Sequence, residues 1–549
     1  TGNGLTANSQ CQSRRSFVHD NKNIGRRLAD VNGDGFADIV VAYGNNSIRQ
    51  VFTYVKNSTT AYLLKGITNE YGGIIEIDYM QSTLFNNTQN NSYTLNFNLW
   101  VVQNVTQNNS LIGDFSAIGN YSYVYSGGKF DYNLSEFAGF GLVNETTPAN
   151  TKISHYFHQS EALRGKEFKT EVYNSSGSLF SKQENYFNFT LNDVYRIFLV
   201  GSANYLYDGN AVPKVTNITY SYDGFGNVIR ANNLGDIDKT GDEKYEEFVY
   251  VHNTDNHILD KVLEYSLFDS ANELVKRNRY SYDGLIFGGR PTKADITKIQ
   301  EWHNKGEDPV TQFEYDNFGN LIKQINPLNQ ETKYEYGLRD GTFTFVDRVV
   351  NALGHRTDFE YDLGTGNLLW QEQNEIRTNF VYDKHGRIIK EIRRYDSENL
   401  PTKEYKYSID GTAPEIINIS QRETADNYVT SSFFYDGFAQ LVQLKLLIED
   451  GNAITKNFFY DSAWRVKAEQ NPYIETFAGT ISTPSNTTNK IFYSYDALDN
   501  VIKVTNPDGT SKNTNFDRWT LSDYDENGNK HDYYLDAYGR ITNVIEFNV

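Results

Sequence analysis

The chain has 549 residues, which allows about three to five compact domains or one large repetitive body. Its net charge of −19, without any block of Lys or Arg, argues against a nucleic-acid partner and an anionic membrane surface. The single cysteine, Cys11, excludes an intrachain disulfide framework, and no apolar run approaches the roughly 18 residues of a transmembrane segment.

Aromatic residues make up 15% of the chain, nearly all of them Tyr and Phe, whereas apolar residues reach 38%. A tyrosine side chain suits positions where one end is dry and the other is wet. A thin sheet with solvent near both faces matches this composition better than a thick globular core. The chain begins with Thr and has no signal peptide, so we interpret it as a mature product or, as we favour, a piece of something longer. We expect the protein to be secreted or to lie at the cell surface.

Segment 1–50 contains a tight loop in which oxygen-bearing residues alternate. The expected ligands are the side chains of Asp30, Asn32, Asp34 and Asp38 and the carbonyl of Phe36. Ca²⁺ prefers 6–8 oxygen ligands, and Gly35 permits the sharp turn. An EF-hand would need Glu where Val41 stands, so this loop precedes a strand over 39–43. We predict a structural Ca²⁺ site, with a metal-free Asx turn as the alternative.

Segment 51–215 alternates strand-like stretches with Gly and Asn turns and has no countable repeat, so we treat it as a β-rich region. Asn-x-Ser/Thr sequons are frequent before about residue 220, for example Asn57, Asn86, Asn104, Asn120, Asn133, Asn144, Asn174, Asn188 and Asn217. A chain rich in Asn, Ser and Thr makes such sequons by chance. The alternative is a glycosylated extracellular protein.

Segment 216–549 repeats one local pattern, which is clear in residues 311–336. Thr, Phe and Tyr alternate with Gln and Glu over 311–315, which predicts a half-buried strand. Asp316 and Gly319 then form a turn, a second strand follows over 320–325, and Pro327 fixes a second turn before a strand at 332–336. Each unit is therefore two strands and two tight turns of an antiparallel meander.

The pattern recurs at irregular intervals, and the Tyr-Asp pair marks most copies. These begin at Tyr222, Tyr282, Tyr315, Tyr361, Tyr382, Tyr435, Tyr460, Tyr495 and, as a Leu-Asp variant, Leu535. We assign these residues to packing and turn formation, not to ligand contact.

An acidic loop, Asp236-x-Asp238-x-Thr240-Gly-Asp242-Glu243, has a looser spacing. It is either a weak cation site or, as we favour, a solvated turn between hairpins. The histidines are scattered, and HExxH, Gly-x-Ser-x-Gly, GxGxxG and Walker patterns are absent. We therefore expect no enzymatic activity.

These features resemble known families in the same order along the chain. The Asp30–Asp38 loop is similar to the Ca²⁺ loop of FG-GAP/VCBS propeller blades. The stretches 136–143 and 156–179 resemble the middle region of SpvB-like and Tc-toxin B proteins, with Ala138 where Arg is usual and Ser160 where Gly is usual. The Tyr-Asp pattern resembles the YD repeats of the Rhs/YD-repeat family, found in Rhs polymorphic toxins, teneurins and the Tc-toxin B component.

The resemblance implies an all-β chain whose YD hairpins spiral into a hollow shell, or part of one, after an FG-GAP/VCBS-like segment (1–50) and a middle region (51–215). It also implies a container for a toxic or unfolded cargo, with a toxin-bearing C component and a translocation channel as partners. A closed sheet would hide its strand edges. The alternative is an extracellular YD-repeat surface protein for adhesion or glycan binding.

Overall fold

A computed structural model describes residues 18–19, 22–23, 25–32, 36–44, 49–55, 63–89, 92–191, 194–339, 341–424, 427–486 and 489–547. This part of the chain is almost entirely β-structure. None of its helices has the length and apolar character needed to cross a membrane.

The elements of the first half are β1 (Val18–His19), β2 (Lys22–Asn23), β3 (Arg26–Ala29), β4 (Asp38–Gly44), β5 (Arg49–Tyr54), β6 (Gly66–Thr68), β7 (Ile74–Gln81), η1 (Ser82–Leu84), β8 (Thr88–Gln89), β9 (Ser92–Tyr93), β10 (Trp100–Asn108), η2 (Gly113–Phe115), β11 (Ile118–Ser126), β12 (Phe130–Asp131), β13 (Glu136–Phe137), β14 (Leu142–Thr146), β15 (Lys152–Phe157), β16 (Glu167–Tyr173), β17 (Leu179–Leu191), β18 (Tyr195–Leu206), β19 (Lys214–Tyr222), β20 (Val228–Asp236), β21 (Lys244–Asn253), η3 (Thr254–Asn256), β22 (Ile258–Asp269) and β23 (Leu274–Tyr282).

Those of the second half are β24 (Ile296–Glu301), β25 (Val310–Tyr315), β26 (Leu321–Ile325), β27 (Glu331–Tyr336), β28 (Val346–Val350), β29 (Arg356–Tyr361), β30 (Leu368–Gln373), β31 (Ile376–Tyr382), β32 (Ile388–Arg393), β33 (Lys403–Ser408), β34 (Glu415–Arg422), β35 (Tyr428–Tyr435), β36 (Leu441–Leu447), η4 (Glu449–Gly451), β37 (Asn452–Tyr460), β38 (Val466–Thr476), β39 (Lys490–Tyr495), β40 (Val501–Thr505), β41 (Ser511–Asp517), β42 (Thr520–Tyr524), β43 (Lys530–Leu535) and β44 (Ile541–Phe547).

One sheet contains most of these strands, in the order β6, β7, β10, β11 and then β14 through β44, each antiparallel to its neighbours. Its ladder ends at β6 and at β44, and no pairing joins those two strands within the described residues. Within the described residues the sheet therefore spirals without pairing of its two ends, which fits the hollow shell, or part of one, expected from the sequence. The reason is that the late strands contact the early strands through the turns at their ends. In the described part of the chain, their edges do not pair with the edges of the early strands.

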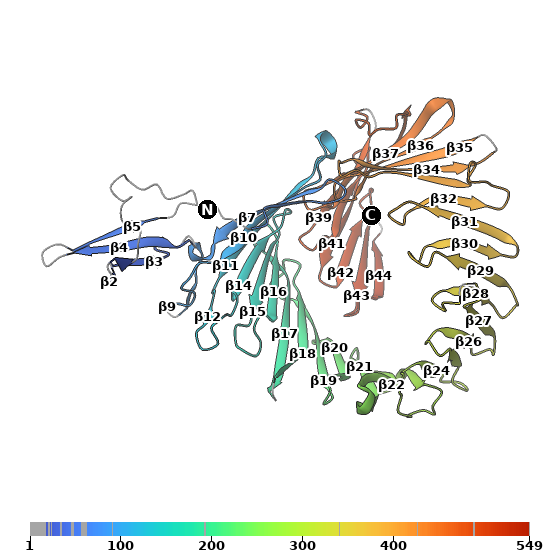
Figure 1. Cartoon of the computed structure of the whole chain (residues 1–549), viewed down its shortest axis with the longest axis horizontal. Helices are drawn as coiled ribbons and strands as arrows, with labels where there is room; N and C mark the ends of the chain where they lie inside the picture. The colour runs from blue at the N-terminus through green and yellow to red at the C-terminus, as the bar shows by residue number, and fades with distance from the viewer. Residues whose placement is uncertain are drawn as a thin grey trace.

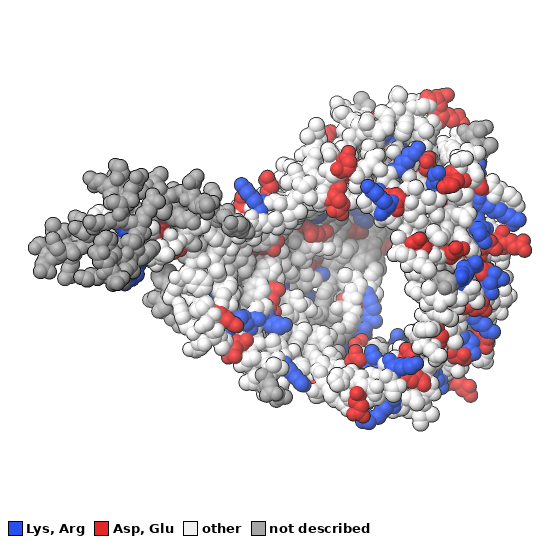
Figure 2. Space-filling view, in the orientation of Figure 1, with Lys and Arg blue, Asp and Glu red and all other residues white. Residues whose placement is uncertain are grey.

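The sheet curls into a hollow wall. Figure 1 shows the strands following one another around a ring, with β35–β44 returning beside the strands at the start of the sheet. Figure 2 shows a central opening that side chains leave unfilled. The same sheet runs through the middle region and the YD repeats. The all-β hollow architecture predicted from the sequence is thus confirmed, and β3–β5 form a separate small sheet before it.

The repeat predicted at 311–336 is present as the strands β25, β26 and β27. Tyr315 donates its hydroxyl hydrogen to the carbonyl of Ile296 on the preceding strand, at 2.9 Å. The same bond to the preceding strand recurs with lengths of 2.7–3.0 Å from Tyr222, Tyr250, Tyr282, Tyr382, Tyr407, Tyr460 and Tyr495. A strand-end tyrosine, usually but not always followed by Asp, therefore ties many of the hairpins to the preceding strand.

A β-bulge accompanies the repeat. The pairing register shifts between Glu314 and Tyr315, and again just before Tyr361, Tyr382 and Tyr460. A bulge bends its strand and increases the local right-handed twist. Because the same bend recurs in successive hairpins, the sheet curves continuously.

The aspartate of each repeat builds the turn. The Oδ1 atom of Asp316 accepts hydrogen bonds from the backbone N–H groups of Phe318 and Asn320, and its Oδ2 atom accepts one from the side chain of Asn320. Gly319 adopts a φ of 88°, which favours glycine. In the copy at Asp383, burial acts in the opposite direction, but hydrogen bonds from Arg387 and the turn backbone lower the pKa of the carboxyl to about 2.

Replacing Tyr382 by Phe should weaken the link between β30 and β31, because it removes the donor to Leu368 O, 2.8 Å away. We expect the local opening free energy to fall by about 1 kcal/mol, and amide exchange there to rise about fivefold. Hydrogen–deuterium exchange with mass spectrometry measures this. The control is Tyr361→Phe, since the Tyr361 hydroxyl has no hydrogen bond in the described chain. Equal effects of the two substitutions would contradict the assignment.

Candidate functional site: the seam and the free edge of the spiral

The hairpin ends of the sheet form two rims. The YD rim carries the Tyr-Asp turns, such as 316–319, and the opposite rim carries the intervening loops, such as 326–330. Where the late strands return, YD-rim turns of β35–β44 meet opposite-rim loops of β10–β21. We call this set of contacts the seam.

The first seam contact joins the turn after β35 to the start of the sheet. Asn109 donates from Nδ2 to Asp436 Oδ2 at 3.1 Å, and its carbonyl accepts the backbone N–H of Gly437 at 3.0 Å. Asn69 donates to the carbonyl of Gly437 at 2.7 Å. Gly73 lies so close that a Cβ atom there would stand 2.1 Å from Gly437 O. The two backbones meet where no side chain fits.

Asp436 departs from the other YD turns in a way that explains this contact. In the turns at Asp316 and Asp383, the second carboxylate oxygen binds the side chain four residues later, which is Asn320 or Arg387. The corresponding residue here is Gln440, whose side chain binds the carbonyl of Trp464 instead. Asn109 then supplies the missing donor from 327 residues away. Burial raises the pKa of Asp436, against the hydrogen bonds that it accepts.

Further contacts continue the seam along the sheet. Trp464 donates from its indole nitrogen to Gln107 at 2.6 Å. The backbone N–H of Arg518 donates to Asp208 at 2.7 Å, and its guanidinium donates to the carbonyl of Val212 at 3.1 Å. Burial raises the pKa of the Asp208 carboxyl. Each late turn therefore engages a loop further along the early strands.

The acidic loop at 236–243 belongs to the seam. Asp236 is fully buried and paired with Lys214 at 3.0 Å, and the backbone N–H of Asp236 donates to the carboxylate of Asp242. The carbonyl of Asp242 accepts the hydroxyl of Tyr538 at 2.7 Å, and Lys244 lies over the Tyr538 ring. The loop does connect two hairpins, but it is a docking element and not simply a solvated turn.

The apolar core of the described chain lies at the seam. Its buried members are Leu111, Phe115, Phe434, Val442, Phe459 and Ala468. Phe115 stacks on Phe459 with ring centroids 5.4 Å apart. The early loop and the late strands thus share one small core. This core joins the beginning of the spiral to its later part, while the rest of the wall is one sheet thick.

Outside the seam, the loops of the opposite rim carry exposed apolar side chains. Leu328, Leu353 and Tyr395 lie in its loops after β26, β28 and β32 and are 76%, 79% and 90% exposed. The equivalent loop within the seam buries Leu111 and Phe115. The last strand, β44, is exposed along its whole length and pairs on one side, with β43. These exposed loops and the exposed strand β44 therefore present apolar side chains and backbone groups of the kind that are buried in the seam, but no described residue covers them.

The predicted calcium loop is described in part. Asp38 is fully buried and accepts the backbone N–H of Val31 at 3.0 Å, while Asn32 is exposed and Phe36 packs toward Trp100. Asp34 lies outside the described residues. The loop precedes the strand β4, as the sequence predicts. Within the described ranges, no three His, Cys, Asp or Glu residues are grouped to hold a metal ion.

The middle region contains one substitution that the structure explains. Ala138, where the similar families carry Arg, is 1% exposed, and its backbone N–H bonds to the carbonyl of Lys129 at 2.8 Å. Gln159 bridges the carbonyls of Gly127 and Gly139 beside it. A side chain as long as arginine does not fit at this position without displacing its neighbours.

Two family models match the sequence. Residues 5–171 match the insecticide toxin TcdB middle/N-terminal region, and residues 298–548 match the teneurin YD-shell. No curated protein gave a match. The resemblance to Rhs/YD-repeat and Tc-toxin B proteins inferred from the sequence is thereby confirmed.

Solved structures agree on the fold. The crystal structure of TcdB2-TccC3 covers 95% of this chain with a TM-score of 0.78 at 15% identity, and this chain covers 37% of it. A mutated Tc holotoxin pore of Photorhabdus luminescens covers 95% with a TM-score of 0.79 at 13% identity, and 39% of it is covered. The chain spans well under half the length of these structures, and likeness at such identity shows the fold alone.

Replacing Gly73 by Ala should open the first seam contact, because the new Cβ would stand 2.1 Å from the carbonyl oxygen of Gly437. We expect amide exchange at 436–440 to rise by about tenfold or more. Gly224→Ala is the matched control, since a Cβ there meets nothing within 4 Å. Unchanged exchange in Gly73→Ala would mean that the two backbones do not approach each other in solution.

Proposed function

Because this chain joins a TcdB-type middle/N-terminal region to a YD-shell in a protein similar to Tc-toxin B components, we propose that it is a non-enzymatic wall segment of a container for a toxic or unfolded polypeptide. The observation that carries the proposal is the hollow, curved wall with an open end (Figure 2). Such a protein acts outside the cell that makes it.

Containment follows from the physics of the cavity. An unfolded chain gains stability by burying apolar surface, which must offset its conformational entropy. A container of this kind would need an inner face that offers the guest little apolar area. A guest held inside it has no surface on which to collapse, and the wall separates it from proteases and from other chains.

The partner that we propose is a toxin-bearing C component that supplies a further set of YD hairpins. TcdB2 occurs with TccC3 in one of the similar structures. A strand added beside β44 would satisfy its free backbone groups, and the YD turns that follow would cover Leu328, Leu353 and Tyr395 as the seam covers Leu111. A channel component is the second proposed partner, because a Tc holotoxin pore is among the similar structures.

The test is co-expression with a YD-repeat C component that carries a protease-sensitive reporter at its C-terminal end. We expect a stable complex in which the reporter resists thermolysin. The double substitution Val544→Pro and Ile545→Pro should abolish the complex, because one of the two prolines removes an outward N–H of the edge strand.

Ile286→Pro, at a loop position that is 85% exposed, is the control and should leave the complex intact. A reporter digested as fast in the complex as on its own would count against containment.

We also propose that the loop from Asp30 to Asp38 binds Ca²⁺ as a structural ion. The alternation of oxygen-bearing residues in this loop supports the proposal, because Ca²⁺ prefers 6–8 oxygen ligands. The side chain of Asp38 would stand at the end of the loop, with Asp30, Asn32, Asp34 and the carbonyl of Phe36 as the other ligands, and the ion would stiffen the entry into β4.

Calorimetry with CaCl₂ should show binding to the chain, and Asp34→Ala should remove that binding and the rise in melting temperature that Ca²⁺ produces. Asp260→Ala, at an exposed aspartate in β22, is the control. Absence of binding by the unmodified chain would leave the loop as a metal-free turn.

A further inference from the structure

A row of amide side chains crosses three neighbouring strands in the second half of the wall. Gln443 on β36, Asn457 on β37 and Gln470 on β38 are direct cross-strand partners and are all fully buried. Gln443 donates to Asn457 and Asn457 donates to Gln470, each at 2.7 Å. Lys445, two residues from Gln443 on the same strand, is fully buried as well.

A segment of the chain itself covers this row. Residues 477–486, which we call the strap, connect β38 to β39 without regular structure. Gln443 donates to the carbonyl of Ser482 at 3.0 Å and accepts the backbone N–H of Ser482 at 2.9 Å. Lys445 donates to the carbonyl of Thr480 and Gln470 to that of Ser485. The wall thus holds an extended segment by its backbone, through side-chain amides that imitate a neighbouring strand.

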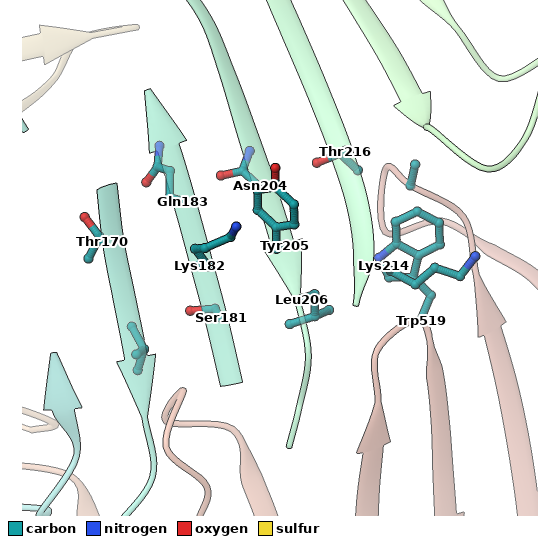
Figure 3. Close-up of a pocket in the computed structure, with 12 residues that line it drawn as sticks. Thr170, Ser181, Lys182, Gln183, Asn204, Tyr205, Leu206, Lys214, Thr216 and Trp519 are labelled. Carbon is teal, nitrogen blue, oxygen red and sulfur yellow. The ribbon is translucent and has the colours of Figure 1, made fainter. Parts of the chain in front are cut away.

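A second row has the same pattern and no strap. Gln183 on β17, Asn204 on β18 and Thr216 on β19 are direct cross-strand partners, and Lys214 lies two residues from Thr216 on the same strand. Figure 3 shows Gln183, Asn204 and Thr216 in line across the strands. Gln183 and Asn204 are exposed, and the side chains of Asn204 and Thr216 make no hydrogen bond within the described residues.

The second row lines a cavity. Its volume is about 370 Å³, and Trp519, from the turn after β41, stands at one end. The ammonium group of Lys214 lies 5.2 Å from the centroid of the Trp519 ring (Figure 3). The cavity therefore offers a row of polar side chains, one aromatic face and two ammonium groups, those of Lys182 and Lys214, which are paired with Glu184 and Asp236. The covered row presents the same kinds of polar groups to the strap, with Phe434 beside Lys445 at 5.6 Å.

We propose that the row Gln183–Asn204–Thr216, with Lys214 and Trp519, binds an extended polypeptide by its backbone. The ligand class is an unfolded segment of any sequence, because amide side chains pair with the N–H and C=O groups that every residue carries. This deepens the container function and rests on it: the site would hold one stretch of an unfolded cargo along the wall.

The probe is a fluorescein-labelled peptide with the strap sequence AGTISTPSN, titrated with the whole chain and followed by anisotropy and by Trp519 fluorescence. We expect saturable binding, equal binding of a scrambled peptide, and binding weaker by about tenfold when alternate backbone nitrogens are methylated. The double variant Gln183→Met and Asn204→Leu keeps the side-chain shapes without the amides and should weaken binding by about tenfold.

The control is Gln330→Met, which alters a separate amide-lined cavity between the loops after β26 and β28. No binding to the unmodified chain, undiminished binding of the methylated peptide, or equal losses in the double variant and the control would overturn the proposal. If the reporter is protected but the peptide does not bind, this peptide site is rejected and the container function is retained. Peptide binding without protection would support the site and count against the container.

Discussion

The fold depends on one repeated hydrogen bond, from the hydroxyl of a strand-end tyrosine to a backbone carbonyl of the preceding strand. Tyr315 makes it to Ile296 and Tyr460 makes it to Leu441. Burial raises the pKa of Tyr460 to about 12, so this hydroxyl keeps its proton at neutral pH. Tyr407 makes the same bond although Ser408 follows it, which separates the tyrosine's role from that of the turn aspartate. Where a bulge lies beside the tyrosine, as at Tyr315 and Tyr460, the bulge supplies curvature and the hydroxyl bond stabilises it.

A wall built this way needs little core, but it needs a device that sets the pitch of the spiral. The seam serves that purpose. The contact between Gly73 and Gly437 sets how closely successive turns approach, and Asn109 completes a turn whose own sequence lacks the required donor. The cluster of buried apolar residues around Phe115 and Phe459 lies at this seam, because it is the place where two layers of backbone meet. The rest of the wall stays one sheet thick and encloses solvent (Figure 2).

Much of the fold could be predicted from the sequence, because the hairpin signals are local. The strands around Asp316 and the strand after Asp38 fall within a residue or two of their predicted positions. The seam could not be predicted, because Asn109 and Asp436 are 327 residues apart and neither stands out in its surroundings. One weak signal was present: Gln440 replaces the Asn or Arg that closes the other turns. The amide rows were missed because cross-strand neighbours on long strands share no sequence spacing.

The central claim is that the YD hairpins join edge to edge into one curved wall around solvent, with a free end at β44. Single-particle electron cryomicroscopy of the purified chain tests it most directly. The account predicts a particle with an empty centre, a wall one sheet thick, and extra contact density where the early and late strands meet. Separate solid globules, or a filled centre, would contradict it.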